Sequence, residues 1–264
     1  MSESRIPNPT PNPTPNQFQT PYAANPTAPA SQVIHGVGAT PSALGVKPDA
    51  RLANAFLAQA FLWMFAGLFV TAGVAYFVQT NPNLLAFARG SGFLLIMVQL
   101  GIVIGITGLI NRISATAALG LFFVYAATLG ITIGYIVSLY TTGSVVTAFL
   151  SASAMFGAAA VYGRVTNRSL AGLQGYLFMA LIGLVVAMVL NIFLQSSAVT
   201  WLISIVGVGL FTVLTAYDVQ RISSGDLAAR LGSMEKAAVV GALQLYLDFI
   251  NLFLFMLRLL GSGR

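Results

Sequence analysis

The sequence contains very little charge for its length. Only 7% of its 264 residues are charged, whereas a soluble globular domain carries about 25%. Between positions 90 and 220 the formal charges are limited to Arg112, Arg164, Arg168 and Asp218. A chain with so few charges cannot cover a water-exposed surface, so the composition predicts an integral membrane protein.

Cysteine is absent, and the single histidine is His35. These absences exclude disulfides, thiol catalysis and metal sites built from cysteine or from a histidine cluster. The net charge of +6 does not indicate nucleic-acid binding. The basic residues stand singly or in pairs at the ends of apolar segments, as membrane topology places them, and not in one basic patch.

Proline is almost confined to the N-terminal region. Ten of the eleven prolines lie within the first 48 residues, many of them in PNPTPNPTPN at 7–16. This Pro-, Asn- and Thr-rich tract has too little apolar content to bury a core, so residues 1–46 are predicted to form a disordered cytoplasmic tail. The tail lacks the basic start and apolar stretch of a signal peptide. A Pro-rich docking segment is the alternative interpretation.

Long apolar runs are what the chain has in abundance. Seven runs of about 20 residues predict transmembrane helices, and turn-forming residues separate them. Barrel strands would be about ten residues long and would alternate apolar with polar side chains, so helices are favoured. The predicted fold is an all-α membrane domain over 47–264. The predicted spans are 52–78, 93–110, 116–139, 145–163, 170–191, 199–219 and 237–259.

The positions of Lys and Arg predict the orientation. Nine of the twelve basic residues lie in the tail or in breaks on the same side as the tail, against Arg89, Arg258 and Arg264 on the other side. The positive-inside rule therefore places the N-terminus in the cytoplasm and, with seven spans, the C-terminus outside. Six spans and a re-entrant last segment would place both ends inside. The expected location is a bacterial cytoplasmic (inner) membrane.

The last apolar segment carries a polar stripe. Gln244, Asp248 and Asn251 are spaced four and three residues apart, so they share one face of a helix. A charge at the bilayer centre costs about 2.5–3.5 kcal/mol on insertion scales. The stripe must therefore face protein or a water-filled cavity. A neutral aspartic acid that only donates a hydrogen bond between helices is the alternative.

Asp218 is the other acid inside a predicted span, near the cytoplasmic end of the sixth. If it meets Asp248, one shared proton is the state of lowest energy, and the two titrations are coupled. Such a pair can sense pH or contact a divalent cation, with protons competing. The different depths of the two acids in their spans argue against the contact. Arg112 would hold a nearby pair ionised, or it serves only as a topology marker.

Two motifs resemble the Bax inhibitor family of transmembrane proteins. They are TAYDVQRI at 215–222 and LYLDFINLFLFMLRLLG at 245–261, and the resemblance covers roughly residues 50 to 261. It implies seven helices with the last one central and wrapped by the other six. It also implies a pH-sensitive cation leak, chiefly of calcium, gated by a carboxylate pair. The motif acids fall on Asp218 and Asp248, which are therefore the predicted pH-sensing, gating and Ca²⁺-contacting residues.

The chain departs from this family at two positions in the second span. Relatives often carry an acid where this sequence has Gln99, and some bacterial relatives carry an arginine that pairs with the acids. Arg112 lies about two residues later than a gapless match would place that arginine. The predicted site is completed by Arg112 as a possible latch, and by Gln99, Tyr217, Gln244 and Asn251 as supporting polar residues.

The leading hypothesis is a pH-gated calcium leak channel, which is not an enzyme and needs no cofactor. The second is an interaction protein that modulates a membrane protease or another partner without ion flux. An intramembrane aspartyl protease is disfavoured. Its GxGD motif would fall on SSGD at 223–226, only eight residues after Asp218 and in a charged loop. A proton-coupled transporter would use the same acids and stays open as an alternative.

Overall fold

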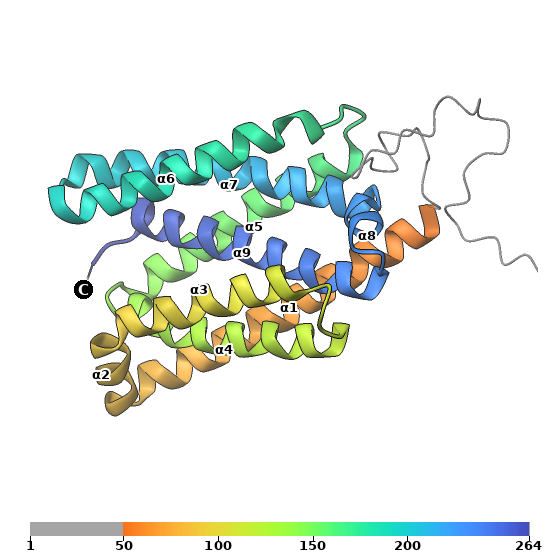
Figure 1. Ribbon diagram of the computed structural model, residues 1–264. Helices are drawn as coiled ribbons and strands as arrows, with labels where there is room; N and C mark the ends of the chain where they lie inside the picture. Colours follow the sequence, from red (N-terminus) through yellow and green to blue (C-terminus); the bar gives the residue numbers. More distant parts are fainter. Residues whose placement is uncertain (1–49, 264) are drawn as a thin grey trace, which may run out of the picture. The chain divides into compact units, whose positions relative to one another are not determined.

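The computed structural model describes residues 50–263, and the predicted tail at 1–46 lies outside them. The regular structure of the described part is helical, as predicted (Figure 1). Seven of its helices are long and apolar enough to cross a membrane. These seven are α1 (Ala50–Thr80), α3 (Gly92–Leu109), α4 (Ala115–Ser138), α5 (Thr142–Val165), α6 (Gln174–Leu194), α7 (Ser197–Ser223) and α9 (Met234–Leu260).

Three short helices join these spans: α2 (Pro82–Gly90), η2 (Ala171–Leu173) and α8 (Asp226–Leu231). The seventh span, α9, is one continuous helix of 27 residues, about 40 Å long at 1.5 Å per residue. It is therefore long enough to cross a bilayer, and the alternative of a re-entrant last segment is not needed. In Figure 1, α1 begins at the right and α9 ends at the left, so the described chain enters and leaves the bundle at opposite ends.

The breaks between the spans contain the residues that begin the next helix. A side-chain oxygen at the N-cap accepts a hydrogen bond from a backbone N–H that would otherwise have no partner, which contributes about 1 kcal/mol. Such caps stand at Ser114 before α4, Thr141 before α5, Ser196 before α7 and Ser233 before α9. The turn signals read from the sequence are therefore helix-start signals.

The last helix is central. α9 packs against α1, α4, α5 and α7, and 72% of its most apolar stretch is buried inside the protein, against 11% for α6. The two outer helices do not pack mainly against α9. Instead, α3 packs mainly against α4, and α6 packs mainly against α7. Helix α6 therefore lies on the outside of α7, with little of its own surface buried.

A hydrogen-bonded group sets the rotation of α9. The Tyr246 hydroxyl lies 2.5 Å from Thr71 Oγ1 of α1, and Thr71 also donates to the Ala126 carbonyl of α4 at 2.9 Å. Tyr246 is fully buried there. Since successive residues turn by about 100° around a helix, Asp248 then points away from α1 and α4.

Small residues four apart let helices pack closely in lipid, so the spacings of Gly130/Gly134 and of Gly101/Gly105 predict two packing faces, and only the first pair is one. A Cβ on Gly130 would lie 2.9 Å from the Thr71 carbonyl oxygen, and one on Gly134 would lie 2.8 Å from a backbone oxygen of α1, so α4 touches the α1 backbone here. A Cβ on Gly101 or Gly105 would meet no atom within 4 Å. The prediction for that second pair is wrong within the described chain, because α3 lies at the edge of the bundle.

Candidate functional site

Asp218 of α7 and Asp248 of α9 meet inside the protein. Their side chains are only 6% and 4% exposed, and a side-chain hydrogen bond joins the two carboxyl groups. Two ionised carboxylates have only acceptor atoms, so a hydrogen bond between them requires a proton on one of them. The structure thus brings together the two acids that the sequence motifs paired.

The two acids can meet although they stand at different positions along their helices, because α9 starts beyond the end of α7. At 1.5 Å per residue, Asp218 lies about 8 Å before the end of α7, whereas Asp248 lies about 21 Å after the start of α9. The start of α9 must therefore extend beyond the end of α7. The helix α8 carries the chain across this offset between Gly225 and Gly232, whose φ angles of 76° and 62° favour glycine.

A cavity of about 340 Å³ lies beside the two aspartates. It occurs where α6 covers α7 more closely than it covers α9. The polar stripe of α9, formed by Gln244, Asp248 and Asn251, faces this cavity, as the sequence predicts for a stripe shielded from lipid. The other lining residues are Gln174, Leu177, Phe178, Leu181, Phe211, Leu214, Tyr217, Asp218, Arg221 and Leu247.

Three buried polar side-chain atoms without a hydrogen-bond partner in the described chain belong to residues that line this one cavity. They are Arg221 Nε, Gln244 Oε1 and Asp248 Oδ2. A buried polar atom left without a partner costs about 1–3 kcal/mol. Their clustering indicates that the cavity suits a polar occupant, and at about 30 Å³ per molecule it has room for roughly ten waters.

The arginine at the site is Arg221 and not Arg112. Arg221 lies on the same face of α7 as Asp218, three residues later, lines the cavity, and interacts electrostatically with that acid. Arg112 is exposed in the turn after α3 and does not line the cavity. Arg221 was not among the site residues predicted from the sequence, although the spacing of Asp218 and Arg221 in DVQR was a usable signal.

The other supporting residues divide between two places. Tyr217 is buried in the cavity wall, and Asn251 is half-buried there, donating to the backbone of its own helix at 2.8 Å. Gln99 lies elsewhere, between α3 and α4, where its amide donates to Thr132 Oγ1 at 2.8 Å. Gln99 therefore joins two helices and is not among the residues that line the cavity.

The site has few ligands for a metal ion. Within residues 50–263, no three Asp, Glu, His or Cys side chains gather closely enough to hold one. A Ca²⁺ ion takes 6–8 oxygen ligands. Beside the aspartate pair it would find two carboxyl groups and the amide oxygens of Gln244 and Asn251, with water for the rest. Such a ligand set suits a transient contact better than tight storage.

Seven apolar helices, one of which is central and carries a buried carboxyl group, define a polytopic membrane protein. The family model described as "Inhibitor of apoptosis-promoting Bax1" (Bax1-I) matches residues 53–264. The chain therefore belongs to the Bax inhibitor family.

Relatives in distant bacteria resemble the chain over most of its length. An uncharacterized protein of Borreliella burgdorferi is 42% identical over 223 residues, which are 83% of this chain and 96% of that protein. Inner membrane protein YbhL of Escherichia coli K12 is 40% identical over 225 residues, with the same two coverages. Uncharacterized protein YrjE of Lactococcus lactis is 39% identical over 213 residues, covering 79% of this chain and 91% of YrjE. The seven helices and the likeness to YbhL support a multi-pass inner-membrane location.

Proposed function

We propose that the protein is a pH-sensitive calcium (cation) leak channel, gated by the pair formed by Asp218 and Asp248. The observation that carries this proposal is the buried contact between the two carboxyl groups beside a polar cavity. Membrane-embedded acids that face a cavity are typical of ion and proton pathways. The proposed activity requires no covalent chemistry and no cofactor.

The shared proton explains how such a pair would gate. With one proton between them, the carboxyl groups hold α7 and α9 together and carry a single negative charge. When the proton leaves, two like charges about 4 Å apart repel each other by about 4 kcal/mol at an effective dielectric constant of 20. That repulsion favours separation of the helices, and the two carboxylates then attract a cation. Protons and Ca²⁺ therefore compete, and flux is expected to rise with pH.

The proposal places the N-terminus in the cytoplasm and the C-terminus outside. The Lys236 ammonium at the start of α9 lies 3.5 Å from the Asn111 carbonyl, in the turn that also holds Arg112. Lys236 and Arg112 thus lie at the same end of the bundle, where the positive-inside rule expects the cytoplasm. Reporter fusions after residue 264 and in the α3–α4 turn would check this orientation.

Calcium flux into liposomes that contain the purified protein tests the gate. Flux is measured at about pH 6, 7 and 8 for the wild type and for Asp218→Asn and Asp248→Asn. The wild type is expected to conduct more as pH rises. Each asparagine variant keeps the shape of a protonated acid, so it should remain at low flux at every pH. Glu235→Gln, which removes an exposed acid from the same helix α9, is the matched control and should behave like the wild type.

Three results would refute the proposed gate: no flux at any pH, a pH dependence that survives both asparagine substitutions, or flux that falls as pH rises. With no flux, modulation of a membrane protease or another membrane partner becomes the leading function. Deletion of residues 1–46 separates these two functions, since a channel formed by the seven helices should conduct without the tail.

A further inference from the structure

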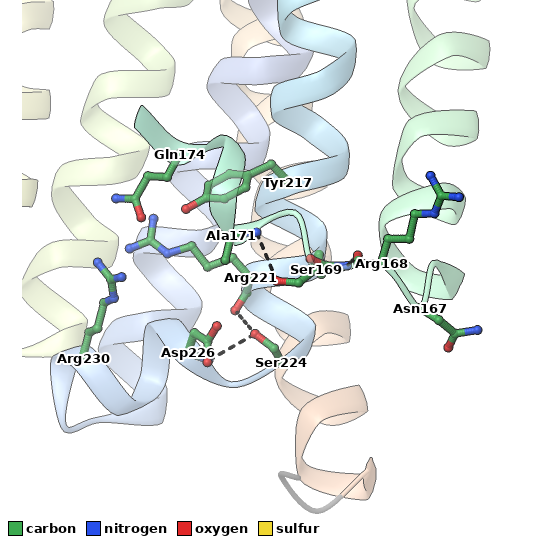
Figure 2. Close-up of a pocket in the computed structure, with 11 residues that line it drawn as sticks. Asn167, Arg168, Ser169, Ala171, Gln174, Tyr217, Arg221, Ser224, Asp226 and Arg230 are labelled. Atoms are coloured by element: carbon green, nitrogen blue, oxygen red, sulfur yellow. Dashed lines mark hydrogen bonds between the residues drawn. The ribbon is translucent and has the colours of Figure 1, made fainter. Parts of the chain in front are cut away.

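A second pocket opens at the end of α7, where η2 and α8 meet it (Figure 2). Its volume is about 280 Å³, and polar side chains dominate its lining. Ser224 and Arg230 are among its lining residues. The Ser224 hydroxyl donates a hydrogen bond to the Arg221 carbonyl at 3.1 Å. It lies at the end of α7 where Arg168, Arg221 and Arg230 gather.

The surface pocket and the intramembrane cavity share three lining residues: Gln174, Tyr217 and Arg221. Figure 2 shows these side chains converging at one end of the surface pocket, with Arg221 extended toward Gln174. Because each of the three borders both spaces, they lie between the two, and this partition is called the neck below. Beyond the neck lies the cavity with Asp218 and Asp248.

Arg221 places a fixed positive charge in this neck. Its side chain is half-buried, and its Nε atom is buried without a hydrogen-bond partner in the described chain, so the charged group is partly withdrawn from solvent. A charge in such surroundings is screened less than a charge in water. A cation that moves from the surface pocket to the aspartates would therefore approach a like charge, whereas an uncharged molecule would not.

We propose that Arg221 is the charge barrier of an access route that leads from the surface pocket, through the neck, to the aspartate pair. In the proposed channel, on which this role rests, Arg221 is a specificity-determining residue that slows cations on the side of the aspartates nearest to α8. The route itself can be tested without any measurement of flux.

Because the chain contains no cysteine, a single introduced cysteine is the one thiol that a reagent can modify. Gln244→Cys places one thiol in the intramembrane cavity, and Ser224→Cys places one in the surface pocket. Each thiol is reacted in proteoliposomes with a trimethylammonium-ethyl methanethiosulfonate and with the neutral methyl methanethiosulfonate. The readout is the ratio of the cationic to the neutral rate, which is insensitive to a general change in packing.

For the thiol at position 244, Arg221→Gln is expected to raise this ratio about tenfold, as the loss of one unit charge in a poorly screened neck implies. Arg221→Lys keeps the charge and should keep the wild-type ratio. Arg230→Gln removes the same charge from the surface pocket outside the neck and should change the ratio by less than about twofold. The thiol at position 224 should react readily in every background.

The barrier is overturned if Arg221→Gln leaves the ratio unchanged, if Arg230→Gln raises it equally, or if Arg221→Lys behaves like Arg221→Gln. The route is overturned if the thiol at position 244 reacts with neither reagent while that at position 224 does. These failures are distinct from failure of the channel. Absence of calcium flux with the expected rate ratios would remove the channel and keep the route, whereas pH-dependent flux with unchanged ratios would keep the gate and remove the barrier.

Discussion

Replacing Gly163 by alanine tests how rigidly α5 and α7 are held beside the aspartate pair. Gly163 lies where the backbones of the two helices touch, and a Cβ there would lie 2.2 Å from the Ala216 carbonyl oxygen and 2.8 Å from its carbonyl carbon. A close carbon–oxygen contact is about 3.3 Å long, so the two helices must separate by about 1 Å. Backbone atoms cannot swing away as the tip of a side chain can.

The expected loss of stability follows from this displacement. Overpacking inside a protein destabilises it by about 1–3 kcal/mol, and a contact with backbone belongs at the upper end, at about 3 kcal/mol. Ala216 lies two residues before Asp218, so the same shift also disturbs the carboxyl contact between α7 and α9. Gly163→Ala should therefore lower both the free energy of unfolding and the pH dependence of calcium flux.

Gly157→Ala is the matched control on the same helix. A Cβ at position 157 would meet no atom within 4 Å, so this substitution should leave stability unchanged or raise it by about 0.5–1 kcal/mol through better helix propensity. Both variants are unfolded in mixed detergent with increasing SDS and compared with the wild type. If Gly163→Ala unfolds within about 0.5 kcal/mol of Gly157→Ala, the close packing of α5 on α7 does not limit stability and the reasoning is refuted.

Three further predictions use the same unfolding assay. Tyr246→Phe should lower the free energy of unfolding by about 1 kcal/mol, because the bond to Thr71 is lost; an unchanged value would show that this bond contributes nothing. Gln99→Leu should cost about 1 kcal/mol through the lost tie to α4, with the pH dependence of flux unchanged; an altered pH profile would contradict its placement away from the gate. Ser233→Ala should cost about 1 kcal/mol and speed hydrogen exchange in the first turn of α9, and equal exchange would show that the cap is not needed.

Much of the fold was predictable because the membrane imposes strict local rules. A chain in lipid must satisfy its backbone groups within each span, so length and hydropathy were enough to predict seven helices. The capping residues lie beside the helices they begin, which made the breaks readable. The spacing of Gln244, Asp248 and Asn251 predicted a polar face on α9, because helix geometry alone decides which residues share a face.

The partners across helices were harder to predict. Gly101 and Gly105 repeat the spacing of Gly130 and Gly134, yet only the second pair meets another helix. Gln99 occupies a polar position in the second span but bonds to α4 and not to the aspartates. Spacing describes one helix, whereas contact depends on which helix lies opposite.

By itself, the sequence determined the class of protein, the number of spans and the two acids of the candidate site, the last through motifs that resemble the Bax inhibitor family. Only the tertiary structure decided that these acids meet and that Arg221, not Arg112, lies beside them. The physical reason is the offset between α7 and α9. Their relative depth depends on the path of the chain through α8 and on the packing of four helices around α9, and no local pattern of residues records either.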